Sequence, residues 1–441
     1  MQKSLADNHR KNFDADDFKS RIGAQWSNDW LRVGGYIGSS KEKGGLPGSL
    51  SAAAYAQDPS QAGGYTQRFM LRHEDHGLFA QAQLGAWELA ADGKWRTKAF
   101  RSTDNFAGFS DSDVKSKNFS LRAKHQIKTD GYTNALTLGF DHSKTDADRR
   151  STWSAAKPSA KNIAWYIKDD ISFPSNGTQL SAGLRTEKVD RVSGVQALHQ
   201  RLHAWDLGVT QAITPQWSAF ARLAKAFRVA NVDELPPFGA AGILEPQTSR
   251  DLEAGLRWNT TDNKLELRAY RSRLEHEIAL NDGGIGGFTN INFDPTKRSG
   301  IELDGSTAIS KTVQLSAHLG LRRAEFRSGA YAGKRVPLVP KQALSLGADW
   351  QALPGHDLMA RANFVGKQAV LVSNGCQVPG FATLDVGYRY TVGSWELNTQ
   401  VQNLGDKRYY NWAFGCVNPN TPTGIYPESG RRINATLSYQ F

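Results

Sequence analysis

The densest run of side chains that could bind a metal ion is His73-Glu74-Asp75-His76. A His-Glu-x-x-His zinc site places two histidines four residues apart on one face of a helix, with the glutamate beside them. Here the two histidines are three residues apart, and residues 74–77 are predicted to form a short turn between strands. We therefore expect no metal site in this run.

Other patterns that could support catalysis are incomplete. Asp111 and Asp113, and likewise Asp146 and Asp148, offer oxygen ligands suited to Ca²⁺, but the full calcium-loop pattern is absent. The glycine run at 283–287 does not lead from a strand into a helix, so we interpret it as a Gly-rich loop rather than a nucleotide site. There is no Gly-x-Ser-x-Gly elbow and no convincing pair of carboxylates. We expect neither enzyme activity nor a cofactor.

Composition and charge narrow the class of protein. The chain has 441 residues and a mean hydropathy of −0.52. No run approaches the ~18 apolar residues that a membrane-spanning helix needs. With 54 Lys and Arg against 43 Asp and Glu, the net charge is +11. This excess suits either a solvated surface or attraction to anionic ligands, lipid headgroups or nucleic acid. Residues 1–20 contain no apolar stretch typical of an export signal.

Hydrophobic residues recur with a period of two, which indicates strands that would position any site. In 431–441 every second residue from Ile433 to Phe441 is apolar, and polar residues lie between them. The same alternation is present at 119–127, 265–269, 313–319, 344–348, 382–390 and 395–401. Arg, Lys, Glu and Gln fill the polar positions, which favours a wide polar lumen over a packed core.

Connections alternate between short and long. Turn residues mark short connections at 27–29, 74–77, 129–131, 174–177, 214–215, 261–263, 354–355 and 392–394. Longer stretches lie near 39–65, 89–115, 142–161, 189–199, 227–248, 278–297, 323–340, 367–379 and 408–430. Short turns at one rim and long loops at the other are typical of an outer-membrane β-barrel.

The expected number of strands is roughly nineteen, an odd number. A closed single-chain barrel usually has an even number, with both termini on one side. Residues 1–17 are expected to start on the long-loop side, so we infer that the first strands are missing from this chain.

Seven tryptophans are expected near strand ends, where an amphipathic ring sits well at lipid headgroups; ordinary core aromatics are the alternative. They are Trp26, Trp30, Trp165, Trp217, Trp258, Trp350 and Trp395.

The C-terminal region carries a family resemblance. Residues 403–410 (Asn-Leu-Gly-Asp-Lys-Arg-Tyr-Tyr) resemble the Asn-Leu-Phe-Asp-Lys-x-Tyr box of the TonB-dependent outer-membrane receptors, with Gly405 where Phe is usual. They are followed by Tyr-Pro-Glu-Ser-Gly-Arg at 426–431. The last strand, with Tyr439 and the terminal Phe441, resembles the signal that the barrel-assembly machinery reads.

Upstream segments extend the resemblance. Residues 226–235 are similar to the family's Phe-Arg-Ala-Pro-Asn box, with Ala230 in place of the proline. Residues 244–256 match the strand that follows this box, and weaker matches lie at 298–303 and 45–48.

The resemblance implies an all-β fold: a large antiparallel transmembrane β-barrel with about 19 of an expected 22 strands, spanning residues 1–441. Receptors of this family import ferric siderophores, cobalamin and related scarce ligands across the outer membrane of Gram-negative bacteria. The family's N-terminal plug and TonB box have no counterpart here. We therefore expect TonB to act only through a plug that this chain lacks. Outer-membrane lipid, lipopolysaccharide and the barrel-assembly machinery are expected as partners, and nucleic acid is not.

Cys376 and Cys416 both fall in long loops on neighbouring strand pairs. In an oxidising exterior they could form one disulfide that ties two loops together, and the alternative is two separate thiols. We favour the disulfide.

The resemblance implies a ligand site among the long loops. An anionic iron chelate calls for cationic groups and for aromatic rings that stack on it. The candidates are Arg149, Arg150, Trp153, Arg228, Phe238, Arg327, Tyr331, Trp412 and Tyr426. Haem is disfavoured, because family haem receptors carry a histidine near the Phe-Arg motif and residues 229–243 contain none.

The resulting hypothesis is a receptor barrel for TonB-energised uptake of a scarce nutrient, with a ferric siderophore as the favoured ligand. Three alternatives remain at this point. Cobalamin is an alternative ligand. A barrel without a plug would act as a passive outer-membrane pore. The last alternative is a structural or adhesive surface β-protein, or a soluble basic binding module.

Overall fold

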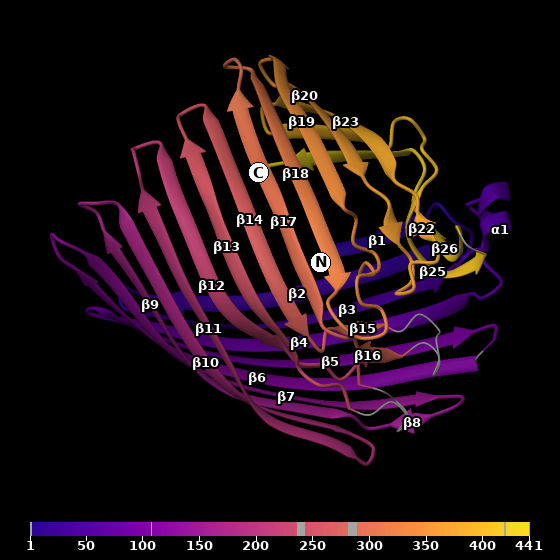
Figure 1. The fold of residues 1–441 in the computed structure, drawn as a ribbon, viewed down its shortest axis with the longest axis horizontal. Helices are drawn as coiled ribbons and strands as arrows, with labels where there is room; N and C mark the ends of the chain where they lie inside the picture. Colours follow the sequence, from indigo (N-terminus) through magenta and orange to yellow (C-terminus); the bar gives the residue numbers. More distant parts are fainter. Residues whose placement is uncertain (1, 107, 236–242, 281–288, 419, 441) are drawn as a thin grey trace.

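The computed structural model describes residues 2–440 except Ala107, 236–242, 281–288 and Pro419. Most of the described residues belong to antiparallel strands of one sheet that curves into a barrel (Figure 1). The main strands are β1 (Gln2–Asp7), β2 (Asp14–Ser27), β3 (Leu31–Leu46), β4 (Gln67–Leu84), β5 (Trp87–Asp104), β6 (Gly108–Lys128), β7 (Thr133–Ser151), β9 (Ser159–Phe173), β10 (Thr178–Ser193), β11 (Gln196–Ala212), β12 (Trp217–Arg228), β13 (Gln247–Asn259), β14 (Asn263–Glu275), β17 (Thr296–Ala308), β18 (Val313–Phe326), β19 (Gln342–Leu353), β20 (His356–Val365), β23 (Phe381–Val392), β24 (Trp395–Gln402) and β27 (Arg432–Tyr439).

Each of these strands pairs with the next one along the chain, from β1 to β27. The prediction of a large antiparallel barrel of about nineteen strands is therefore confirmed. Tight turns connect the strands at one end, which we call the short-turn rim, and longer segments connect them at the other, the long-loop rim.

The short elements all lie at the long-loop rim. They are α1 (Ala52–Gln57), β8 (Ala155–Ala156), β15 (Ile278–Leu280), β16 (Asn290–Asn292), β21 (Gln368–Ala369), β22 (Gln377–Val378), β25 (Tyr410–Asn418) and β26 (Thr421–Pro427). Figure 1 shows α1, β22, β25 and β26 gathered together at this rim. Among the described residues, no helix is long and apolar enough to cross a membrane.

Several predicted connections are strands instead. Residues 74–77 lie inside β4, and the predicted long stretches at 89–115, 142–161 and 189–199 are mostly strand hairpins. The reason is that these strand segments carry many polar residues on both faces. Outside an apolar belt neither face needs apolar side chains, so the alternation that reveals a strand is lost while the backbone pairing continues.

The N-terminal strand runs opposite to the sequence-based expectation. β1 pairs with β2 from Gln2–Lys19 to Asp7–Asp14, so β1 runs towards a hairpin at the long-loop rim and does not start there. Asn12 has a φ of 57° in this hairpin, a conformation that asparagine tolerates. The six-residue β1 is short and mostly polar, which hid it from the alternation pattern. The argument from an odd strand number therefore does not hold.

The outer face of the sheet is an apolar belt bordered by aromatic rings. Leu184 and Leu207 are 62% and 52% exposed, as side chains that face lipid would be. Trp217 and Trp258 are register partners at the short-turn rim, with ring centroids 6.1 Å apart. The prediction that tryptophans lie near strand ends fails for Trp165, which lies in the middle of β9 and is 61% exposed.

Candidate functional site

The lumen face carries charged side chains that are paired with one another. Arg185 on β10 directly follows the exposed, outer-face Leu184, so its side chain points to the opposite face, into the lumen. Its guanidinium lies 2.8 Å from both Asp141 and Glu187, and Asn162 donates a 2.6 Å hydrogen bond to Glu187. The wall is thus polar but locally neutralised, which suits a water-filled lumen.

A second network lines another part of the lumen. Glu302 on β17 accepts a hydrogen bond from Arg268 on β14 and lies 3.6 Å from Arg322 on β18. Arg268 also lies 3.8 Å from Glu253. Because each cation faces a carboxylate, this wall offers little uncompensated charge to a passing anion.

The chain after β12 folds back against the lumen wall. We call residues 229–235 the inward segment. Asn231 begins a tight turn in which its side-chain oxygen accepts the backbone N–H groups of Asp233 and Glu234, at 2.8 and 3.1 Å. Val232 packs in a buried cluster with Val114 of β6 and Ala147 of β7. The segment thus narrows the lumen at the long-loop rim.

Two arginines of the wall hold the inward segment. Arg191 donates from Nε to the carbonyl oxygen of Ala230 at 2.7 Å and from Nη1 to Asn162 at 2.7 Å. Arg149 donates from Nη2 to the carbonyl of Leu235 at 2.7 Å, while its buried Nε has no partner in the described part of the chain. The Nε–H of Arg149 is therefore available as a donor to another group.

Arg150 and Trp153 do not share this position. Arg150 follows Arg149 in β7 and points to the outer face, where it lies 3.6 Å from Asp113 and 3.6 Å from Asp148. Trp153 lies 72% exposed in the turn after β7. Arg150 thus points away from the lumen, since adjacent residues of a strand face opposite sides, and its ligand contact stays a prediction.

The arginines at the other loops are neutralised. Arg228 donates to Glu234 of the inward segment, and Arg327 donates to Glu275. Tyr331 lies against Phe326, with ring centroids 5.9 Å apart. Phe238, also expected to contact ligand, lies outside the described residues. Arg228 and Arg327 thus stabilise loops and carry little free charge.

A second body of structure at the long-loop rim is formed by α1, β21, β22, β25 and β26, which we call the cap. Its centre is a buried cluster of Val370, Val378, Tyr410 and Ile425. Cys376 and Cys416 are joined by a disulfide within it, as the sequence favoured, with their Cα atoms 5.9 Å apart. The disulfide thus links the residue directly before β22 with β25.

The cap is also tied to the N-terminal hairpin. His9 lies between β1 and β2, and its Nε2 is 3.0 Å from the carbonyl oxygen of Pro427. Arg10 is 3% exposed and donates to the carbonyl of Gly48 at 2.7 Å. The His9 contact joins the first hairpin of the sheet to β26 of the cap, and the Arg10 contact joins it to the segment between β3 and α1.

The cap presents an aromatic surface. The rings of Trp412 and Tyr426 are stacked, with centroids 4.7 Å apart and planes inclined by 12°, and Phe414 lies 6.0 Å from Tyr426. Burial raises the pKa of Tyr426, so its hydroxyl remains protonated at neutral pH. Trp412 is 39% exposed, which leaves part of its ring free to stack on a planar ligand.

The carboxylates considered for calcium are used in ion pairs. Arg101 contacts Asp113 at 2.7 Å and Asp111 at 3.6 Å, and Lys144 lies 3.3 Å from Asp146. The His73–His76 run, being part of a strand, alternates between the two faces of β4. In the described ranges no group of three or more His, Cys, Asp or Glu is placed to hold a metal ion.

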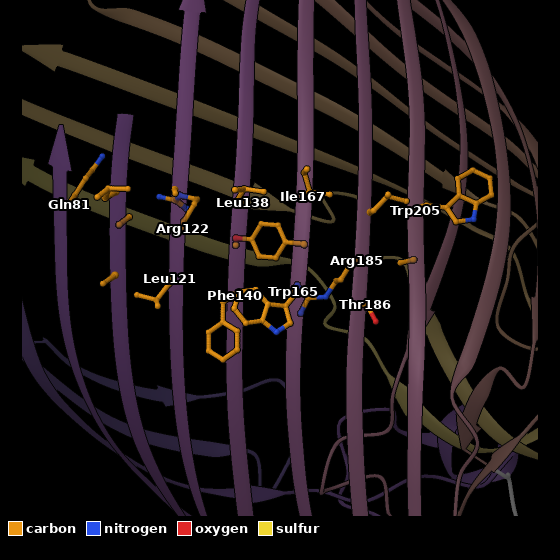
Figure 2. Close-up of a pocket in the computed structure, with 18 of the residues that line it drawn as sticks. Gln81, Leu121, Arg122, Leu138, Phe140, Trp165, Ile167, Arg185, Thr186 and Trp205 are labelled. Atoms are coloured by element: carbon orange, nitrogen blue, oxygen red, sulfur yellow. The ribbon is translucent and has the colours of Figure 1, made fainter. Parts of the chain in front are cut away.

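A large apolar hollow of about 1070 Å³ lies on the outer face and not in the lumen (Figure 2). It follows two register rows across neighbouring strands, with pairs such as Leu121–Phe140 and Ile167–Leu184. Arg122 and Arg185 border this hollow because their neighbours in sequence face outwards, while their own side chains point into the lumen. This hollow belongs to the apolar belt and is a poor site for a hydrated ligand.

The structure therefore divides the sequence-predicted ligand residues into separate groups. Arg149 and Arg228 meet at the inward segment, and Trp412 and Tyr426 meet in the cap. No hydrogen bond, ion pair or ring contact between described residues joins these groups or connects them with Arg327 and Tyr331. Sequence reasoning missed Arg191. Its position in an alternating strand is the only feature of the sequence that could have indicated a role for it in the lumen.

Comparisons with known proteins agree with this architecture. The family model described as TonB dependent receptor-like, beta-barrel matches residues 3–404. The chain is 30% identical over 194 residues to the probable TonB-dependent siderophore receptor PiuA of Acinetobacter baumannii, covering 39% of this chain and 25% of that protein. It is 23% identical over 332 residues to the vitamin B12 transporter BtuB of Vibrio vulnificus, covering 74% of this chain and 50% of that protein.

A solved structure extends the comparison to the fold. The crystal structure of the unliganded ferric citrate transporter FecA superimposes with a TM-score of 0.84 at 16% identity. The match covers 100% of this chain and 74% of that one. At this identity the likeness shows the fold alone. The chain spans a quarter to a half of the length of the two relatives it matches.

Proposed function

Because the chain belongs to the family of TonB-dependent receptors, we propose that it is the barrel of an outer-membrane receptor that takes up a ferric siderophore with energy supplied through TonB. The observation that carries this proposal is the family match over residues 3–404, joined to a relative named as a siderophore receptor. Any contact with TonB is proposed to pass through a plug.

The geometry at the long-loop rim supports a ligand of this class. The stacked rings of Trp412 and Tyr426 offer an aromatic surface to a catechol or another planar iron-binding group. The free Nε of Arg149 offers one cationic donor deeper in the lumen. We propose that the aromatic pair makes the first contact and that Arg149 acts after the inward segment moves.

The surroundings of the barrel are part of the proposal. We propose that it lies in the outer membrane of a Gram-negative bacterium, with lipid and lipopolysaccharide against its outer face. We propose further that the barrel-assembly machinery reads the last strand. Tyr439 in this strand is exposed, and its ring lies 4.7 Å from that of Trp395. Phe441 lies outside the described residues.

A binding assay tests the proposal. The purified chain in detergent would be titrated with a ferric catecholate, a ferric hydroxamate, ferric citrate and cobalamin, with tryptophan fluorescence as the readout. We expect saturable quenching by one of the ferric chelates, weakened about tenfold in Trp412→Leu because aromatic stacking contributes ~1.5 kcal/mol. The matched control is Trp30→Leu, which removes another exposed ring at the opposite, short-turn rim. Equal binding by wild type and Trp412→Leu would contradict the assigned surface.

Cobalamin is the second candidate, because a vitamin B12 transporter is among the relatives. Saturation by cobalamin alone would favour it over a siderophore. Binding of no ligand, together with a large open-channel conductance in planar bilayers, would instead favour the passive pore.

A further inference from the structure

A second groove on the outer face combines an apolar floor with basic residues. It has a volume of about 1010 Å³ and lies at the long-loop ends of β18, β19, β20 and β23. Leu319, Leu344 and Phe364 are successive register partners across these strands and form its floor. They share the face of the exposed Leu346 and Leu384. The floor is therefore continuous with the apolar belt.

Four basic residues line the same groove: Arg335, Lys341, Lys367 and Lys407. The three lysines are exposed and Arg335 is half-buried. No Asp or Glu is among the described residues that line the groove, and within the described ranges none of the four cations forms an ion pair. This differs from the lumen, where arginines face carboxylates.

The local structure holds two of these cations in place. Asn403 has a φ of 49°, and its side chain accepts the backbone N–H of Lys407 at 2.9 Å and donates to the Lys407 carbonyl at 2.9 Å. Asn374 accepts the backbone N–H of Arg335 at 2.8 Å and donates to its carbonyl at 3.0 Å. Both backbone positions are therefore fixed before any ligand arrives, which lowers the entropy cost of binding.

We propose that this groove binds a phosphorylated, acylated lipid, namely the bisphosphorylated lipid A portion of lipopolysaccharide. The acyl chains would lie on Leu319, Leu344 and Phe364, and the phosphates would contact the basic residues at the rim. Charge complementarity identifies this occupant. Four cations without carboxylate partners call for more than the single phosphate of a common glycerophospholipid, and the apolar floor excludes a hydrated acidic protein.

This inference rests on the proposed outer-membrane location and names a site for the lipopolysaccharide partner, but it does not depend on which ligand is transported. The apolar hollow of Figure 2 provides an internal contrast, because it has a similar volume but no cluster of outer-face cations. Lipid chains would contact both hollows, whereas phosphates would select the groove beside Lys407.

Native mass spectrometry tests the proposal. The purified, lipid-stripped chain would be titrated with bisphosphorylated lipid A, fully dephosphorylated lipid A and phosphatidylglycerol. We expect tight binding of the bisphosphorylated form only. The variant Lys341→Gln/Lys367→Gln/Lys407→Gln should raise its Kd roughly 100-fold, because each basic residue near an anionic lipid contributes about a fivefold factor.

The control variant Lys128→Gln/Lys264→Gln/Lys311→Gln removes the same charge at the short-turn rim and should bind lipid A as the wild type does. Folding of both variants would be checked by the shift in gel migration on heating. Unchanged binding by the groove variant would overturn the proposal. Equal wild-type binding of dephosphorylated lipid A or of phosphatidylglycerol would overturn it as well, without relying on any variant.

Discussion

The cap and the inward segment both lie at the long-loop rim, yet different interactions hold them in place. The cap has a disulfide and a buried apolar cluster that includes Val378 and Ile425. The inward segment has only small apolar clusters around Val232 and Leu235, and arginines of the wall also hold it through hydrogen bonds to backbone carbonyls. Charged ligands and water can take the place of one partner in a charge-assisted hydrogen bond, whereas they cannot replace a disulfide or an apolar cluster. We therefore expect the inward segment to move when a ligand binds and the cap to remain fixed.

The largest expected effect comes from removing the disulfide. Replacing Cys376 and Cys416 with serine should destabilise the cap by about 4 kcal/mol, because the bond closes a loop with a sequence separation of 40. Hydrogen exchange of the β25 amides would measure this loss, with the inward segment as the internal control. Equal loosening of the inward segment would contradict the view that the two regions are held independently.

The next effect concerns Arg191. Arg191→Met keeps the aliphatic stem but leaves the buried carbonyl of Ala230 without its charged donor, so opening of the inward segment should become easier by about 3 kcal/mol. Hydrogen exchange of residues 229–235 would measure the change. Arg201→Met, which alters an exposed arginine on β11, is the matched control and should shift stability by less than about 0.5 kcal/mol. An unchanged exchange rate in Arg191→Met would show that this arginine does not hold the inward segment in place.

Raising the pH should weaken the cap, whereas Arg191→Met weakens the inward segment. Burial raises the pKa of Tyr410 to about 12, above its ordinary value of 10.0. The neutral phenol is therefore favoured in the folded cap, and this contribution is complete below pH 10 and is lost as the pH rises through about 12. Absorbance of tyrosinate and near-ultraviolet circular dichroism would follow the transition. In Tyr410→Phe the cap should lose less stability over this range, and an identical loss would exclude Tyr410 as its cause.

The smallest effect belongs to the exposed ion pair of the inward segment. Lys98 lies 3.6 Å from Asp233, and the two side chains are 32% and 54% exposed. Lys98→Gln should therefore weaken the segment by about 0.5 kcal/mol at low salt and by less at high salt. Hydrogen exchange at two salt concentrations would measure it. A loss as large as that of Arg191→Met would mean that ion pairing, and not the buried hydrogen bonds, holds the segment.

The strands could be predicted where local alternation reports them, as at 431–441, and the two cysteines could be paired because both fall in neighbouring loops. The lumen contacts could not. The sequence of residues 142–161 predicts a loop and so treats Arg149 and Arg150 alike, although a strand places them on opposite faces. Arg191 reaches Ala230 across 39 positions of sequence, and no local pattern records such a contact.

The outer groove illustrates the same limit of sequence reasoning. The sequence identifies Lys407 only as part of a family box, but its place beside Phe364 depends on the register of β20 with β23 and on the turn that Asn403 stabilises. Register is set by pairing between whole strands and cannot be read from either segment alone.

The most direct test of the central claim is uptake of radioactive iron by the source bacterium with and without the gene that encodes this chain. Cells would be given one ferric siderophore at a time, with and without a protonophore that removes the energy for TonB. We predict that deletion abolishes energy-dependent uptake of one siderophore and that the gene restores it from a plasmid. Unchanged uptake of every ferric siderophore in the deletion strain would contradict the account.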